Sequence, residues 1–161
     1  MNQGTLAGTV DWLEKNLGGA ACVVFEMGPS RDRLERISEN TEVRFDGCQM
    51  TLHQATVSGS LSELRTLTVP LGALTPDGVT LSEGFNLPSG WVSTGDVPTH
   101  TIRLAVAPGE RQIEARLERF DVAAPSRYQT ASVDILVRHQ EAAERILAAL
   151  SHAIALCREQ R

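Results

Sequence analysis

Apolar and polar residues alternate through most of the middle of this chain, and the pattern changes abruptly near residue 140. A period of two is typical of strands with one buried face, whereas apolar residues that recur every three or four positions indicate a helix. Between residues 20 and 138 the period of two returns in a series of short segments. Such a chain is expected to fold around a β-sheet that helices from its two ends cover.

The helical period occurs at both ends. The first apolar stripe lies within residues 6–17 and consists of Leu6, Val10, Leu13 and Leu17. Gly18-Gly19 follow it and predict the end of the helix. A wider stripe lies within residues 140–159 and consists of Ala143, Ile146, Leu147, Leu150, Ala153, Ile154 and Cys157. The sequence therefore predicts two amphipathic helices, at 6–17 and 140–159.

Turn residues separate the predicted strands. Asp46-Gly47 stands between two alternating segments and predicts a hairpin, with a bulge in one long strand as the alternative. Pro108-Gly109 predicts a second hairpin, between strands around 102–106 and 113–117. Pro70 cannot donate a ladder hydrogen bond, so its strand should lie at a sheet edge or contain a bulge there.

Two segments are less regular. Residues 28–42 carry Gly, Pro, Ser and many charges, and they are compatible with a loop or with a short helix. Residues 75–78, Thr-Pro-Asp-Gly, predict a turn. Further along, residues 133–137 alternate again and predict the last strand before the C-terminal helix.

The order of the elements predicts one α+β domain over residues 1–161. Its β-rich body spans residues 20–138, with about seven strands in a curved antiparallel sheet or small barrel. The N-terminal helix precedes the body, and the C-terminal helix closes it. A chain of 161 residues is of ordinary size for a single domain.

Charge and hydropathy exclude some classes of function. The formal net charge of −5 argues against nucleic-acid binding, which needs clustered Lys and Arg. No segment approaches the roughly 20 apolar residues of a membrane span, and the N-terminus as written has no signal peptide. We therefore expect a cytoplasmic protein, or an exported one if the N-terminus is a trimmed fragment.

Familiar catalytic and cofactor motifs are missing from the sequence. It contains no P-loop, nucleophile elbow or Gly-x-Gly-x-x-Gly fingerprint, and its four histidines lack the spacing of a zinc site. Glu114, Glu118 and Asp121 alternate with arginines, as on a solvated strand face. We expect no enzyme activity, no cofactor and no metal site.

The three cysteines, Cys22, Cys48 and Cys157, form no Cys-x-x-Cys pair. Cys48 and Cys157 both fall on predicted apolar faces, where a thiol is buried and unreactive. The closing helix must cover the strand that carries Cys48, so these two residues are expected to be neighbours. They would be a buried thiol pair, or a disulfide if the protein is exported.

Residues 84–99 are predicted to form a long loop, and this loop is the segment for which a binding role is most plausible. They include Phe85, Leu87 and Trp91 among several Gly and Pro residues. Long loops in compact domains often bind partners, and these three side chains would be apolar anchors. The alternative is that they fold back and plug the barrel.

Several segments together resemble an uncharacterised group of bacterial domains that are similar in outline to the pleckstrin-homology barrel. They are Thr9-Val10-Asp11-Trp12-Leu13, Val43-Arg44-Phe45-Asp46-Gly47-Cys48, Thr68-Val69-Pro70-Leu71 and Leu150-Ser151-His152-Ala153-Ile154-Ala155-Leu156-Cys157. The resemblance implies a seven-stranded barrel plugged by a C-terminal helix. It also implies a non-enzymatic module that binds peptides, proteins or lipid headgroups, or serves as a scaffold.

Pleckstrin-homology domains that bind phosphoinositides use a basic strand-loop-strand motif. Here the loops at Asp46-Gly47 and 55–64 contain no Lys, and only Arg44 and Arg65 lie nearby. This weighs against a lipid headgroup as the ligand.

Two functional hypotheses follow from the sequence. The first is a non-catalytic binding or scaffold module whose unknown protein or peptide partner contacts the loop 84–99 or an exposed sheet edge; a homodimer is a further possibility. The second is a small-barrel or helix-grip carrier that holds an apolar small molecule between the sheet and the closing helix.

Overall fold

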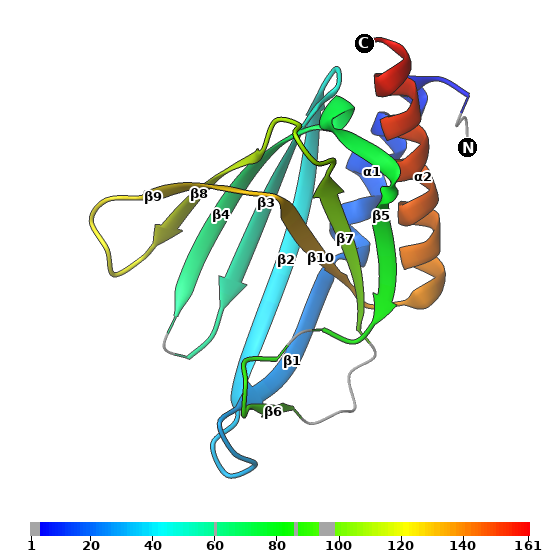
Figure 1. Cartoon of the computed structure of the whole chain (residues 1–161). Coiled ribbons are helices and arrows are strands. Elements are labelled where there is room, and N and C mark those ends of the chain that lie inside the picture. The colour runs from blue at the N-terminus through cyan, green and yellow to red at the C-terminus, as the bar shows by residue number, and fades with distance from the viewer. Residues whose placement is uncertain (1–3, 60, 86, 94–98) are drawn as a thin grey trace.

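Two helices lie side by side against a pair of antiparallel sheets (Figure 1). This computed structural model describes residues 4–59, 61–85, 87–93 and 99–161. Helix α2 spans Gln140–Glu159, as predicted. Helix α1 spans Leu6–Ala20 and so continues through both glycines that were expected to end it. The backbone N–H of Ala21 still donates to the Leu17 carbonyl at 2.8 Å, and Ala21 is buried in the core, which holds the last turn in place.

The larger sheet has seven strands, all paired antiparallel. In spatial order they are β6 (Val92–Ser93), β1 (Cys22–Gly28), β2 (Glu35–Asp46), β3 (Gln49–Val57), β4 (Ser62–Pro70), β8 (Ile113–Arg119) and β9 (Ser126–Thr130). The smaller sheet is also antiparallel, in the order β10 (Ser132–Val137), β7 (His100–Val106) and β5 (Leu74–Glu83).

The α+β class and the antiparallel arrangement are confirmed, but the predicted barrel is not closed. The described residues form ten strands in two sheets, where about seven strands were predicted. Within the described ranges, β6 and β9 are free edges of the larger sheet, because no further strand pairs with them. The difference arises because the chain changes sheets repeatedly instead of extending one sheet until its edges meet.

Three of the connections that carry the chain between the sheets are short; two others lead from β5 to β6 and from β6 to β7. The 3₁₀ helix η1 (Leu71–Ala73) links β4 to β5, residues 107–112 link β7 to β8, and Ala131 alone separates β9 from β10. The hairpin predicted at Pro108-Gly109 is therefore wrong. Strand β8 pairs with β4 and β9, while β7 pairs with β5 and β10. A turn motif shows where the chain reverses, but it does not determine which strand the next segment joins.

The hairpin at Asp46-Gly47 is confirmed. Asp46 pairs with Gln49, so Gly47 and Cys48 are the two central residues of the turn. Gly47 has φ +58°, a conformation that favours glycine. A glycine with positive φ at the first central position is characteristic of tight hairpin turns.

Other local predictions need correction. Pro70 ends β4, an interior strand, and lies beyond Thr68, the last β4 residue that pairs with β8, so it needs neither an edge nor a bulge. Residues 75–78 form no separate turn but an irregularity within β5, where the register shifts between Leu74 and Val79. The open segment 28–42 becomes strand β2 from Glu35 onwards.

The main core lies between the two helices and the two sheets. Helix α2 buries Ala143, Ile146, Ala149, Leu150, Ala153, Ile154 and Cys157, and α1 buries Thr9, Leu13 and Leu17. In Figure 1 the helices lie beside β5 and β7, while β4, β8 and β9 extend away from them. This arrangement leaves part of the larger sheet without helical cover. No helix in the described part of the chain is long and apolar enough to span a membrane.

Candidate functional site

The inner face of the seven-stranded sheet, which meets the core, changes from apolar to polar along its strands. In register across β2, β3, β4 and β8, one row consists of Val43, Leu52, Leu67 and Ala115, all buried. Two residues further along each strand, the next row consists of Thr41, Gln54, Arg65 and Leu117. The third row consists of Glu39, Thr56, Glu63 and Arg119. Side chains two residues apart share a face, so the polar rows continue the core side of the sheet.

A cavity of about 500 Å³ opens over these polar rows, between the larger sheet and β10. The apolar wall, one part of this lining, includes Phe25, Met27, Ile37, Phe85 and Leu136. The polar wall, which adjoins it along β2 and β10, includes Glu39, Thr56, Glu63, Arg65 and Asp134. Helix α2 contributes none of the lining residues. The cavity therefore lies away from the closing helix, on the part of the sheet that the helices leave uncovered.

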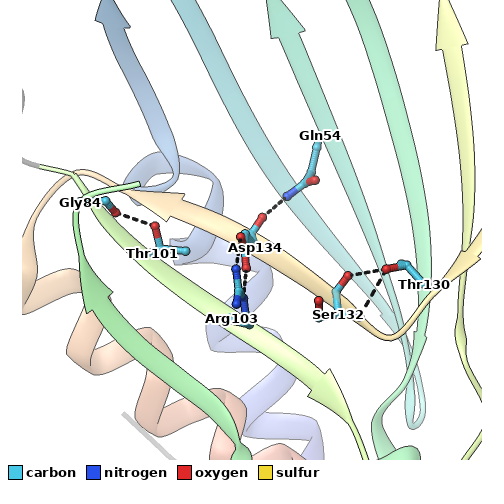
Figure 2. Close-up of polar contacts among 7 residues, drawn as sticks. All are labelled: Gln54, Gly84, Thr101, Arg103, Thr130, Ser132 and Asp134. Carbon is cyan, nitrogen blue, oxygen red and sulfur yellow. Dashed lines mark hydrogen bonds and ion pairs between the residues drawn. The ribbon is translucent and has the colours of Figure 1, made fainter. Parts of the chain in front are cut away.

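Gln54 connects the two sheets at the boundary between the core and the cavity (Figure 2). Its side chain is 4% exposed. The amide nitrogen donates to the backbone carbonyl of Asp134 on β10 at 2.8 Å and to the Thr41 hydroxyl at 3.3 Å. Because β10 is an edge strand of the smaller sheet, Gln54 satisfies a carbonyl that strand pairing leaves unbonded.

Asp134 is paired on the smaller sheet itself. Arg103 on β7 lies directly opposite it in register and donates two hydrogen bonds to its carboxylate, at 2.7 and 3.0 Å (Figure 2). The side-chain bonds from Thr101 to the Gly84 carbonyl and from Thr130 to the Ser132 carbonyl complete the polar frame around β10. A bidentate Arg–carboxylate pair is a directional contact, so the Asp134 carboxylate is already satisfied within the protein.

Two arginines flank Glu63 on the polar wall. Arg119 approaches its carboxylate to 3.3 Å and Arg65 approaches it to 3.7 Å. The Glu63 side chain is 13% exposed, so this is a partly buried ion-pair cluster. The Arg65 Nε atom is buried and has no hydrogen-bond partner among the described residues. An unpaired buried donor is costly, and such groups commonly mark places where a ligand or water completes the site.

Glu39 differs from the other two carboxylates of the cavity. It accepts a hydrogen bond from the Thr56 hydroxyl at 3.3 Å, and within the described ranges it forms no ion pair. Burial raises the pKa of the Glu39 carboxyl above its ordinary value, against the opposing effects of the Thr56 hydrogen bond and the nearby Arg65 charge. A carboxylate on the core face of a strand, without a cationic partner, is an unusual feature for a purely structural wall.

The predicted binding loop contributes one residue to this cavity. Phe85 packs against Phe25 with ring centroids 4.6 Å apart and lies in the lining. Leu87 and Trp91 are half-buried and lie outside the lining. The rest of the predicted loop contains β6, which pairs with the end of β1, and residues 86 and 94–98 lie outside the described ranges. Of the three predicted anchors, the structure therefore places Phe85 in the lining of this cavity.

Cys48 and Cys157 form a disulfide with Cα atoms 5.7 Å apart. The bond joins the β2–β3 turn to the last turn of α2, far from the inter-sheet cavity. Cys22 is a free, exposed thiol. The cysteines therefore contribute a covalent connection in the fold and no lining residue of the cavity.

The charged strip around β8 is divided between the two sheet faces. Glu114, Arg116 and Glu118 are exposed on the outer face, while Arg119 reaches Glu63 on the inner one. Across the described residues, no group of three or more His, Cys, Asp or Glu side chains is arranged to hold a metal ion.

Sequence reasoning did not identify Glu39, Glu63 or Arg65 as cavity residues. Glu39 falls in the segment 28–42, whose interpretation was left open, so its place on a strand face was not assigned. A signal was nevertheless present, because Glu39 lies four residues before Val43 and shares its alternating face. In the same way, Arg65 lies two residues before Leu67 on its strand.

Comparisons of the chain with family models, with curated proteins and with solved structures give no match.

Proposed function

We propose that this protein is a non-catalytic binding module that holds a small amphipathic molecule in the cavity between its two sheets. The observation that carries the proposal is the cavity itself, whose lining combines an apolar part with an adjoining polar part. Its volume of about 500 Å³ lies in the range typical of small-molecule sites. Sites of this kind bind the apolar body of a ligand through area and fix its orientation through a few polar groups.

The lining matches these two requirements. Phe25, Ile37 and Phe85 offer apolar surface from β1, β2 and the segment after β5. Thr56 and Glu39 offer a hydroxyl and a carboxyl beside this apolar surface. The cavity is framed by strands, by the inter-sheet hydrogen bond of Gln54 and by the Arg103–Asp134 pair within the smaller sheet, so the site is largely formed before a ligand arrives.

The ligand site proposed here differs from that of the carrier hypothesis, which lay between the sheet and the closing helix. An apolar ligand between the sheet and the closing helix would have to displace the apolar stripe of α2, which is buried in the core. The inter-sheet cavity offers space without that displacement. The resemblance to pleckstrin-homology-like domains, with their non-enzymatic binding role, also favours a binding module over an enzyme.

The proposal is tested with a neutral amphipathic fluorophore, N-phenylnaphthylamine, whose emission rises in an apolar site. The wild type is expected to bind one probe per chain in a saturable titration. Thr56→Phe should abolish this binding, because Thr56 lines the cavity and the larger ring would fill it. Thr51→Phe is the matched control, since Thr51 is on the same strand but on its outer face.

Native mass spectrometry of the freshly purified protein supplies a second measurement. A retained mass of a few hundred daltons, present in the wild type and in Thr51→Phe but absent from Thr56→Phe, would place a natural ligand in the cavity. No saturable probe binding by any of the three folded proteins would contradict the proposal.

A further inference from the structure

The position of Glu39 is suited to one end of an elongated ligand. Its neighbours in register are Val23 on β1 and Thr56 on β3. Val23, Phe25 and Ile37 form a small buried apolar cluster, against which Met27, Phe85 and Leu136 pack. Glu39 therefore lies where this apolar cluster meets the polar wall of the cavity.

The ion pairs among the lining residues leave Glu39 without a cationic partner. Three carboxylates, those of Glu39, Glu63 and Asp134, line the cavity together with the Arg65 guanidinium. Arg103 pairs with Asp134, and Arg119 and Arg65 approach Glu63. In the described part of the chain no Lys, Arg or His forms an ion pair with Glu39. One partly desolvated negative charge therefore has only the Thr56 hydroxyl as a hydrogen-bond donor.

We propose that the ligand of this cavity is a cationic amphiphile, an apolar chain or ring that carries a protonated amine, and that the Glu39 carboxylate binds the ammonium group. This inference rests on the proposed function of the cavity. An ammonium group supplies both the charge and the N–H donors that a partly buried carboxylate needs. The apolar part of the same molecule would contact the wall formed by Phe25, Ile37 and Phe85.

An anionic amphiphile fits the lining less well. The cationic side chain in the lining, Arg65, faces the Glu63 carboxylate at 3.7 Å and keeps an Nε hydrogen that is unpaired among the described residues, but the carboxylates outnumber it there. The whole chain has a formal net charge of −5, which also favours the approach of cations over anions. Charge complementarity therefore selects an amine and not a fatty acid.

Three molecules that share one apolar tail test this selectivity: octylamine, octanol and octanoate. Each is titrated against the protein loaded with N-phenylnaphthylamine, and displacement of the probe is measured at neutral pH. Octylamine should displace the probe at a concentration about tenfold lower than octanol, the size of effect that one charge-assisted hydrogen bond provides. Octanoate should be the weakest of the three.

Two variants test whether Glu39 causes the preference for octylamine over octanol. In Glu39→Gln the advantage of octylamine over octanol should disappear, so that the two compounds displace the probe at similar concentrations. Glu42→Gln is the matched control, because Glu42 lies on the same strand with its side chain exposed on the outer face, and it should keep the advantage. The glutamine at position 39 can still accept the Thr56 hydrogen bond, and circular dichroism checks that both variants fold.

The outcomes separate this inference from the proposed function. Equal displacement by octylamine and octanol in the wild type, or an amine advantage that survives in Glu39→Gln, would overturn the inference and leave the cavity function standing. A wild-type protein that binds no probe and no octyl compound would overturn both. The wild-type comparison alone decides the selectivity, even if a variant does not fold.

Discussion

The Gln54 side chain donates a hydrogen bond of 2.8 Å to the backbone carbonyl of Asp134. This bond joins the larger sheet to the edge strand of the smaller one, at the place where the filled core ends and the cavity begins. The two sheets thus depend on a buried polar contact as well as on apolar packing for their relative position.

Replacing Gln54 with Leu should destabilise the protein by about 1 to 3 kcal/mol, because the Asp134 carbonyl and the Thr41 hydroxyl both lose the donor that they share. Urea denaturation followed by circular dichroism measures the change. Gln49→Leu is the control, since Gln49 is exposed at the start of the same strand and should change stability by only about 0.5 kcal/mol or less. Equal effects of the two substitutions would contradict the assigned role of Gln54.

The disulfide between Cys48 and Cys157 should stabilise the fold substantially. It links residues 109 positions apart, so in its absence the unfolded chain gains conformational freedom equivalent to about 2 to 5 kcal/mol. Full reduction, or the double variant Cys48→Ala with Cys157→Ala, should lower the melting temperature in a calorimetric scan. Cys22→Ser should not lower it, because that thiol is free and exposed. An unchanged melting temperature after complete reduction would refute this role.

Glu39 should make the stability of the ligand-free protein depend on pH in a defined direction. Burial raises its pKa above the ordinary value of 4.5, so the folded protein binds the proton more tightly than the unfolded chain does. The stability from this neutral form is fully present below the pKa of the unfolded chain and is lost as pH rises through the higher pKa of the folded state.

The stability of Glu39→Gln relative to the wild type should therefore increase between about pH 4 and pH 7, because the variant has no carboxyl to ionise. Urea denaturation of both proteins at the two pH values gives the comparison. Glu42→Gln reports the background effect of removing a carboxylate from the outer face of the same strand. A relative stability that stays level or falls with pH would show that Glu39 is not desolvated in the folded protein.

Two glycines should respond to alanine in opposite directions. Gly47→Ala should cost about 1 to 2 kcal/mol, because φ at this turn position is +58° and a Cβ is disfavoured there. Gly19→Ala should stabilise the protein by about 0.5 to 1 kcal/mol, because Gly19 is in α1 and an added Cβ would meet no atom within 4 Å. Thermal denaturation of the two variants checks both signs. A stabilised Gly47→Ala would show that the turn adopts another conformation.

Elements that depend on local interactions could be predicted from the sequence. The change of period near residue 140 located α2 with both of its ends, and Asp46-Gly47 located the first hairpin. Alternation also identified the inner face of β3, from Met50 to Leu52, because the period of two depends only on backbone geometry. The end of α1 was wrong because tertiary packing holds Gly18 and Gly19 in the helix against their weak helical preference.

The pairing of the strands, and what lies over the polar rows, could not be predicted from the sequence, because both depend on long-range packing. Strand β8 joins β4 across more than forty residues of chain, and β9 passes into the second sheet at Ala131; no local pattern specifies either event. The cavity follows from those pairings, because Glu39, Thr56 and Glu63 become cross-strand neighbours only once β2, β3 and β4 are in register. The sequence pattern of a polar residue on an alternating face is the same whether solvent or a second sheet lies above it. The long-range packing of the chain determines which of the two is present.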